Sequence, residues 1–194
     1  FLANMSHELR TPMHHVLSFS HIGIKKLNSS KDKALDCFEK IIFASNRMMD
    51  LVNNLLDLSK LEFGNREYTF AENDVFQIIS ENLTRLKPQL EEKELSIVMS
   101  QHVVPTAIVC DHATINQVIQ NLFSNAIKFS PKKKCIGVLL DLKNSSLSVS
   151  ITDKGPGIPD NELEFIFDKF IQSSKTKTGA GGTGLGLAIC KEII

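Results

Sequence analysis

Mostly apolar residues between positions 35 and 56 recur at alternating intervals of three and four, and this repeat constrains the fold more than any other feature of the chain. The repeat consists of Leu35, Phe38, Ile42, Ser45, Met49, Val52 and Leu56. Such spacing is typical of the contact seam of a coiled coil or helical bundle. A second helical pattern precedes it, and the polar stretch 28–33 separates the two. The sequence therefore predicts an antiparallel helical hairpin over residues 1–64.

A lone hairpin of this kind leaves apolar surface uncovered. Two antiparallel helices cannot bury two apolar stripes well by themselves, whereas two hairpins can pair into a four-helix bundle. We therefore expect a homodimer in which two copies of the hairpin form a dimeric four-helix bundle.

The pattern changes after Gly64-Asn65, a pair that breaks the second helix. Short β-favouring runs then alternate with amphipathic helical runs, and the strands come mainly in pairs. The predicted strands are 66–70, 95–100, 106–109, 135–142 and 146–153, and the predicted helices are 74–91, 111–129 and 183–194. This mixture predicts an α+β chain in which residues 65–194 form an α/β sandwich domain.

Composition narrows the possible classes of function. The 194 residues carry 22 basic and 22 acidic side chains, so the overall charge favours neither nucleic acid nor an anionic membrane. No apolar run approaches the roughly 20 residues needed to span a bilayer, so membrane contact would come only through parts outside this chain. The scattered cysteines lack metal-ligand spacing, which favours reduced thiols in a cytoplasmic compartment.

Both ends fall inside helical patterns, so we expect a longer protein whose second domain is C-terminally incomplete here.

A histidine motif, Ser6-His7-Glu8-Leu9-Arg10-Thr11-Pro12, lies in the first helix. Helical spacing places the apolar residues Leu2, Met5, Leu9, Met13 and Val16 on one face and the polar residues His7, Thr11, His14, Ser18 and His21 on the opposite face. His7 is therefore expected to face solvent, where a neutral imidazole is a good nucleophile. Glu8 could accept the ring proton when His7 attacks an external phosphate. Thr11 could orient a water for the reverse step, which removes the phosphate.

Two other interpretations of this helix stay open. The histidines can simply belong to a solvated polar face. A metal site built from His7, His14 and His21 is disfavoured, because these residues lie two turns apart, too far to share one ion.

The predicted helix 111–129 carries an unusual polar stripe. Gln117, Asn121, Asn125 and Lys128 follow one another at spacings of four, four and three. Asn is costly in the middle of a helix unless its amide has a partner. Amide oxygens suit Mg²⁺ and a lysine suits phosphate, so this stripe is a candidate wall of a nucleotide site. A polar face with chance amides is the alternative.

Two glycine-containing segments follow. In the first, a strand ends at Asp153 and leads into Gly155 and Gly157, where a carboxylate could accept a hydrogen bond from an adenine amino group. A plain Asp-Gly turn is the alternative. In the second segment, residues 179–187, glycines and the start of a helix offer backbone amides to phosphates.

The second glycine segment also satisfies the dinucleotide-binding fingerprint, but that fingerprint requires a strand directly before it. Here the preceding residues 172–178 are polar, so we reject that interpretation. The low-complexity stretch 173–182 suits a mobile lid, from which Lys175 or Lys177 could reach a phosphate.

Taken together, the short blocks resemble those of two-component sensor histidine kinases. The phospho-acceptor box is similar to residues 6–12, and the family's N-box to residues 121–130. The first glycine box resembles 153–157, the F-box 167–170 and the second glycine box 182–187. The resemblance covers nearly the whole chain, and the blocks stand in the family's order. It implies an ATP-binding domain of the gyrase and histidine-kinase type.

The resemblance also implies roles for individual residues. His7 would be phosphorylated, with Glu8 as its base, and Asn121 and Asn125 would engage Mg²⁺ and the phosphates. The residues expected to bind ATP are Asn121, Asn125, Lys128, Phe129, Asp153, Gly155, Gly157, Lys169, Phe170, Gly182, Thr183, Gly184, Leu185 and Gly186. Lys169 stands where the family frequently has Arg, which keeps the charge and loses the fork geometry.

The function implied is ATP-dependent autophosphorylation of His7 and relay of the phosphoryl group to an Asp of a response-regulator receiver domain, separate or fused. Phosphatase activity through Thr11 is a secondary expectation. One alternative is a non-catalytic, nucleotide-sensing dimerisation module. Another is a gyrase-type ATPase, which is disfavoured because such enzymes use a Glu where this chain has Asn121.

Overall fold

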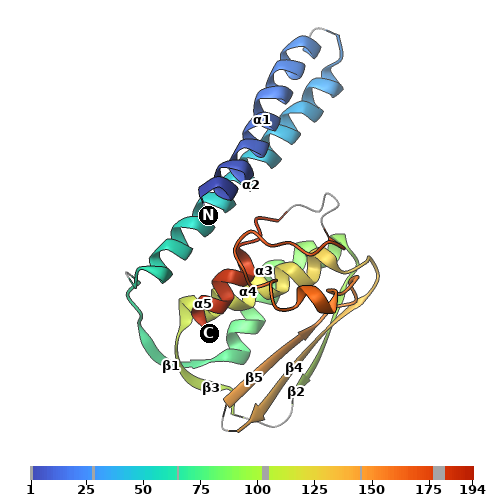
Figure 1. Cartoon of the computed structure of the whole chain (residues 1–194). Helices are drawn as coiled ribbons and strands as arrows, with labels where there is room; N and C mark the ends of the chain where they lie inside the picture. The colour runs from blue at the N-terminus through green and yellow to red at the C-terminus, as the bar shows by residue number, and fades with distance from the viewer. Residues whose placement is uncertain (1, 28, 65, 102–104, 145, 177–181) are drawn as a thin grey trace.

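Two long helices form a rod at one end of the molecule. The computed structural model describes residues 2–27, 29–64, 66–101, 105–144, 146–176 and 182–194. Helix α1 (Leu2–Lys26) and helix α2 (Lys31–Glu62) run antiparallel along each other and are called the stalk below (Figure 1). The chain then passes into a compact body of strands and helices beneath the lower end of α2.

Small side chains hold the two stalk helices together. Ala34, Cys37 and Ala44 are buried on α2 in the upper stalk, whereas the larger Leu51 and Leu58 lie further down, where α5 packs. On α1, Pro12 and Gly23 are buried, and a Cβ atom at Gly23 would lie 3.3 Å from Cys37 Cβ. The upper part of the stalk is thus packed through close helix approach rather than through large side chains.

The three-and-four repeat between residues 35 and 56 lies on a different face of α2 from the buried residues. Its six apolar members are 36–60% exposed, so it is not the seam between α1 and α2. Met13, expected on the apolar face of α1, is also exposed. We call the outward stripe of Leu35, Phe38, Ile42, Met49, Val52 and Leu56 the outer seam. Apolar surface of this extent marks an interaction site in a stable protein.

The body contains two sheets. Strands β2 (Ser96–Gln101), β4 (Cys135–Lys143) and β5 (Ser146–Thr152) form one sheet in the order β2-β4-β5, with β2 parallel and β5 antiparallel to β4. Strands β1 (Phe70–Asp74) and β3 (Ala107–Asp111) form a separate antiparallel pair. These strands and helices α3 (Val75–Glu92) and α4 (His112–Phe129) are called the sandwich below.

Most predicted elements of the sandwich match the observed ones within about three residues, but the first strand was misplaced. It was expected at 66–70 and begins only at Phe70, because Phe70 is the first residue that pairs with β3, opposite Asp111. Asp74 and Asp111, taken as the first helical residues, are instead N-caps. Asp74 accepts a hydrogen bond from Phe76 N at 2.9 Å, and Asp111 accepts one from Thr114 N at 2.8 Å.

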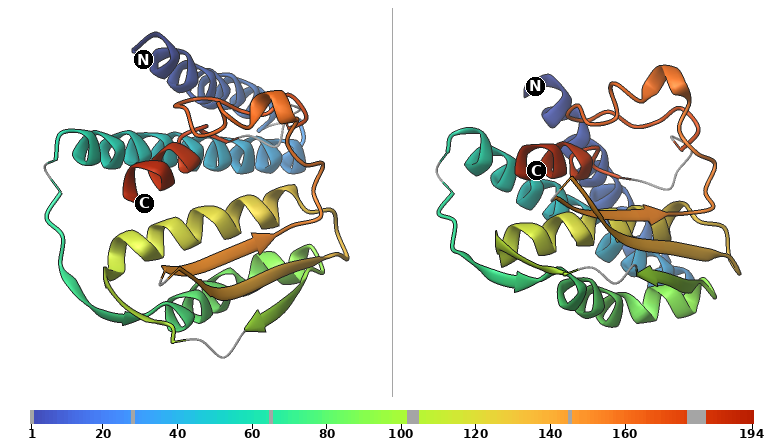
Figure 2. Two further views of the ribbon diagram at one scale, coloured as in Figure 1. Left: turned by 60° about the horizontal axis from the view of Figure 1, so that its bottom comes forward. Right: turned by 90° about the horizontal axis from the view of Figure 1, so that it is seen from below.

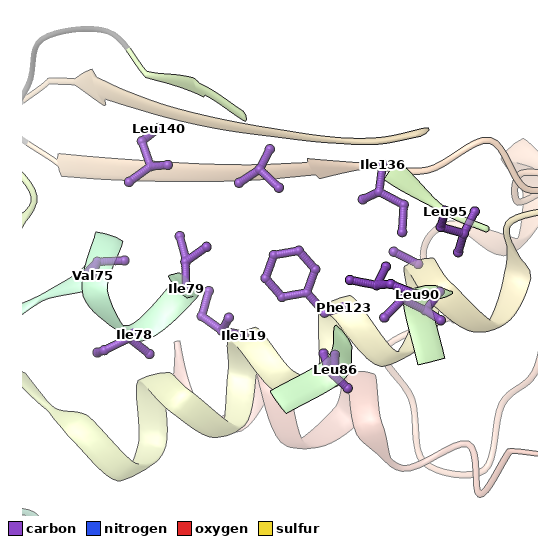
Figure 3. Packing of buried hydrophobic residues seen from close by; sticks show 13 residues of the cluster. Val75, Ile78, Ile79, Leu86, Leu90, Leu95, Ile119, Phe123, Ile136 and Leu140 are labelled. Carbon is purple, nitrogen blue, oxygen red and sulfur yellow. The ribbon is translucent and has the colours of Figure 1, made fainter. Parts of the chain in front are cut away.

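The sandwich core lies between the three-stranded sheet and helices α3 and α4. Figure 3 shows Ile136 and Leu140 of β4 pointing toward Phe123 and Ile119 of α4. Alternate residues of β4 are buried, as expected for a strand with one face on the core. Because α4 is fixed by this core, its opposite, polar side is held rigidly toward the stalk.

A last helix joins the two parts. Helix α5 (Gly186–Ile193) lies between α2 and α4 in both views of Figure 2. Leu185 and Ile189 are buried against Leu51 and Leu58 of α2.

None of the helices in the described part of the chain combines the length and apolar character needed to cross a membrane. All four cysteines are free thiols, and burial raises the pKa of Cys110 and Cys190.

Candidate functional site: a pocket between the stalk and the sandwich

A pocket of about 800 Å³ lies where α2, α4 and the segment 153–187 meet. Its wall includes ten of the residues expected to bind ATP: Asn121, Asn125, Lys128, Phe129, Asp153, Gly157, Gly182, Thr183, Gly184 and Gly186. The sequence blocks are far apart along the chain, and folding brings them to one hollow.

Helix α4 supplies the amide side of the pocket. Asn121 donates a hydrogen bond from Nδ2 to the carbonyl oxygen of Gly186 at 3.3 Å, which fixes the plane of its amide. Lys128 lies over the Phe129 ring at 4.8 Å from the ring centroid. Burial lowers the pKa of the Lys128 ammonium, and the neighbouring Arg47 guanidinium lowers that pKa further. A phosphate bound nearby would oppose both effects, because its negative charge favours the charged form of the lysine.

Gln117, the first member of the predicted stripe, has a different position. It donates to Asp57 Oδ2 at 2.8 Å and accepts from Arg66 Nη1 at 3.1 Å. Gln117 therefore connects α4 to the end of α2 and to the following segment rather than lining the pocket.

The Asp153 end of the pocket is shaped by a tight turn. The backbone N–H of Gly155 donates to Asp153 Oδ1 at 2.6 Å, and Gly157 lies in the wall beside Asp153. Gly155 itself is outside the wall. A Cβ atom there would lie 3.0 Å from the Phe129 carbonyl oxygen and 2.7 Å from Asp153 Oδ1, so glycine lets the turn pack against the end of α4.

The glycine-rich end is built around Gly184. Its φ is +68°, and a Cβ atom would lie 2.7 Å from Phe170 Cα, so any other residue would be strained and would clash. Its carbonyl accepts a hydrogen bond from Phe170 N at 2.9 Å. Leu185 points away from the pocket and is fully buried next to α2.

Lys169 and Phe170, both expected to contact ATP, also lie outside the wall. Lys169 forms an ion pair with Glu62 of α2, and Phe170 packs on the cluster formed by Leu51, Leu58, Leu185 and Ile189. In this arrangement, the two residues therefore attach the F-box to the stalk.

The lid segment is held at its near end. Gln172 donates from Nε2 to the Gly182 carbonyl at 2.7 Å, and Ser174 donates to Glu162. Lys175 donates to the Pro156 carbonyl at 3.2 Å, so it bridges the lid and the first glycine box. Lys177 and residues 179–181 lie outside the described residues.

The stalk also contributes part of the wall, which was not predicted from the sequence. Arg47, Asp50, Asn53 and Asn54 of α2 line the pocket, and Asn54 donates to Thr183 Oγ1 at 3.3 Å. Consecutive asparagines in the middle of a helix were the available signal, because such residues favour caps and turns.

His7 lies on the exposed face of α1 together with Thr11, His14, Ser18 and His21, as predicted. It is outside the pocket wall. Thr11 donates from Oγ1 to the His7 carbonyl at 3.3 Å, a bond along the helix. The neighbouring Glu8 forms an ion pair with Arg47, with Nη2 and Oε2 3.8 Å apart. Among the described residues, no group of three or more His, Cys, Asp or Glu side chains is placed to hold a metal ion.

Two protein-family models match separate parts of the chain. Residues 1–64 match the His Kinase A (phospho-acceptor) domain. Residues 110–194 match the family described as histidine kinase-, DNA gyrase B- and HSP90-like ATPase.

Curated relatives are similar over the whole chain. The sensor histidine kinase GacS of Pseudomonas protegens is 32% identical over 200 residues, which cover 100% of this chain and 22% of GacS. The sensor-like histidine kinase SenX3 of Mycolicibacterium smegmatis is 32% identical over 196 residues, which cover 100% of this chain and 50% of SenX3. The chain thus spans half or less of the length of these relatives.

Two solved structures are similar to this chain over nearly its whole length. The similarity to full-length ShkA in complex with AMPPNP has a TM-score of 0.69 at 26% identity and covers 99% of this chain and 40% of ShkA. Histidine kinase ThkA in complex with the response regulator TrrA shares the fold, with a TM-score of 0.79 at 23% identity over 100% of this chain and 53% of ThkA. The chain belongs to the two-component sensor histidine kinases, of which it carries the phospho-acceptor helices and the ATPase-type domain.

Proposed function

We propose that this chain is the catalytic core of an ATP-dependent protein-histidine kinase that phosphorylates its own His7. The observation that carries the proposal is a pocket walled by amides and glycines that lies directly against the hairpin presenting His7 to solvent. The similarity to ShkA, solved with AMPPNP, supports an adenine nucleotide as the occupant.

The transfer consists of one displacement. A ring nitrogen of neutral His7 attacks the γ-phosphorus of ATP, and a nitrogen–phosphorus bond forms. The bond from that phosphorus to the β,γ-bridging oxygen breaks, and ADP leaves with its electron pair. The proton of the other ring nitrogen passes to the Glu8 carboxylate. Because little covalent chemistry is left to the protein, positioning and charge stabilisation supply most of the acceleration.

Asn121 and Asn125 are suited to hold Mg²⁺ next to the phosphates. Both line the same side of the pocket one helical turn apart, and amide oxygens combined with phosphate oxygens and waters form a donor set that Mg²⁺ accepts. The Nδ2 atom of Asn121 donates to Gly186, so Oδ1 is the atom that would be available to the ion. A bound Mg²⁺ would neutralise charge on the phosphates. Amides cannot act as a base toward water, which favours transfer to histidine over ATP hydrolysis.

We assign the adenine to the Asp153 end and the phosphates to the end formed by Lys128 and Gly182–Gly186. A carboxylate at a strand end suits the adenine amino group. Lys128, a partly desolvated cation, suits a phosphate. Thr11, one turn from His7, is assigned to the secondary, dephosphorylating reaction.

The partners that we propose are a second copy of the chain and a response-regulator receiver domain, separate or fused. The outer seam supports dimerisation, because its exposed apolar side chains are spaced as in a bundle. The ThkA structure, which contains the response regulator TrrA, supports the second partner. We place this part of the protein in the cytoplasm, where ATP is available and thiols stay reduced.

Labelling with γ-³²P-ATP tests the proposal. His7→Gln is expected to abolish incorporation while ATP still binds, because the nucleophile is removed and the pocket wall is untouched. His14→Gln is the matched control, since His14 is an exposed histidine two turns away on the same helix, and it should label normally. Undiminished labelling of His7→Gln would reject the assignment.

A further inference from the structure

Arg47 of α2 contacts both the histidine-bearing helix and the nucleotide pocket. Its Nη2 atom lies 3.8 Å from Oε2 of Glu8 on α1, and its side chain forms part of the pocket wall. Glu8 is the immediate neighbour of His7 in the sequence. A single side chain therefore connects the pocket with the surroundings of the phospho-acceptor.

The ion pair between Arg47 and Glu8 is suited to exchange. It is long, and the two side chains remain 31% and 28% exposed. Ion pairs of this kind contribute little to stability. A phosphate competes well for the guanidinium, because two parallel N–H groups can donate to two phosphate oxygens at once.

A second cation faces the same hollow from α4. Lys128 also lines the pocket, and the proximity of Arg47 contributes to the lowered pKa of its ammonium. Two cations that converge on one pocket repel each other, and an anion bound between them turns repulsion into attraction. A multiply charged phosphate is the anion that the proposed function supplies.

We propose that Arg47 exchanges Glu8 for the terminal phosphate of ATP and is the stalk's own phosphate-contacting residue in the transfer. The inference rests on the proposed function. The exchange has two effects. The guanidinium stabilises the negative charge on the phosphoryl group during its transfer. The released Glu8 carboxylate can then take the ring proton of His7.

The bond changes are those of the transfer to His7. The nitrogen–phosphorus bond forms, the bond to the bridging oxygen breaks with its electron pair going to ADP, and the ring proton goes to Glu8. Arg47 keeps its proton throughout, because a guanidinium does not deprotonate in proteins. It acts only through charge and donated hydrogen bonds.

A purely structural role for Arg47 predicts a different outcome. If Arg47 only ties α2 to α1 through Glu8, its loss changes the stability of the hairpin and leaves the rate per folded molecule unchanged. Separate measurement of the transfer rate constant, ATP binding and the unfolding midpoint distinguishes the two roles.

The test compares Arg47→Gln, Arg47→Lys and Lys40→Gln. Lys40→Gln is the matched control, since Lys40 is another cation of α2 and its ammonium donates to Asp36 at 2.8 Å, away from the pocket. Arg47→Gln is expected to lower the rate constant for phosphorylation of His7 at saturating ATP by about 100-fold. The dissociation constant of ATP should change by less than about tenfold. Arg47→Lys, which retains the charge, should recover part of the rate.

A double substitution sharpens the test. Because Arg47 and Glu8 serve one step, adding Glu8→Gln to Arg47→Gln should lower the rate by less than the product of the two single effects. Equal rates for Arg47→Gln and Lys40→Gln would overturn the inference. If Arg47→Gln fails to fold, Arg47→Lys provides the test. Slower phosphorylation of His7 with unchanged ATP binding would support the proposed role of Arg47, and phosphorylation at the wild-type rate would reject it. Absence of phosphohistidine in the wild-type protein would instead remove the proposed function.

Discussion

The stalk and the sandwich use apolar residues in opposite ways. In the sandwich, large side chains such as Phe123 and Leu140 meet in one closed core. In the upper stalk, small residues such as Ala34, Cys37 and Ala44 are buried between the helices, and the large ones point outward. The sandwich therefore completes its core within one chain, whereas the stalk leaves large apolar side chains exposed. In the proposed dimer, the sandwich supplies stability and the stalk supplies the contact between protomers.

The largest expected effect comes from comparing one phenylalanine of the sandwich with one of the stalk. Phe123 is fully buried in the sandwich, and Phe43 is 71% exposed on the stalk. Phe123→Ala should lower the free energy of unfolding by about 3–5 kcal/mol, because it opens a cavity. Phe43→Ala should change it by no more than about 0.5 kcal/mol. Urea unfolding followed by circular dichroism measures both, and equal losses would contradict the comparison.

A charge on the outer seam should separate the protomers without unfolding either. Ile42→Lys places an ammonium among apolar side chains that face the partner in the proposed bundle, so the dimer dissociation constant should rise by at least about tenfold, or ~1.4 kcal/mol. Glu39→Lys is the control, because Glu39 is exposed outside the seam. Sedimentation over a range of concentrations gives the result, and an unchanged monomer fraction for Ile42→Lys would argue against pairing through this surface.

Acid should weaken the sandwich through Asp111. The backbone N–H groups of Thr69 and Thr114 donate to this carboxylate and hold its pKa below the ordinary value. A lowered folded pKa gives stability that is present above the unfolded pKa, near 3.9, and that is lost as pH falls through the folded pKa. Asp111→Asn should therefore make the urea midpoint of the sandwich fall less steeply between pH 5 and pH 2. Parallel curves for wild type and variant would contradict this role.

The sequence predicted the sandwich better than it predicted the stalk interior. Strand alternation and helix periodicity located most elements, and the α4 amides stood out because Asn is unfavourable in a helix. The first strand was misplaced because Tyr68 and Thr69, which favour β-structure, precede Phe70 but have no pairing partner on β3. In the stalk, Cys37, Ala44, Leu51 and Leu58 repeat every seven residues, but the smaller of them are inconspicuous beside the large residues of the outer seam.

The stalk side of the pocket had one local signal, the pair Asn53-Asn54, which does not say what the two side chains face. Arg47 and Asn54 reach the pocket only because Leu185 and Ile189 dock on α2 and bring the two parts together. Likewise, Lys169 and Leu185 were expected at the nucleotide because their blocks border it, whereas their side chains contact α2. Tertiary docking of this kind depends on shape complementarity between distant segments, which no spacing rule encodes.

We propose that the phosphoryl group passes from the pocket, whose wall includes Arg47 and Asn54 of α2, to the exposed imidazole of His7. Mapping the phosphate after incubation with ATP and Mg²⁺ tests it most directly. We predict one acid-labile, base-stable phosphate on His7. A phosphate on another residue, or steady release of inorganic phosphate with none retained on the protein, would contradict the account.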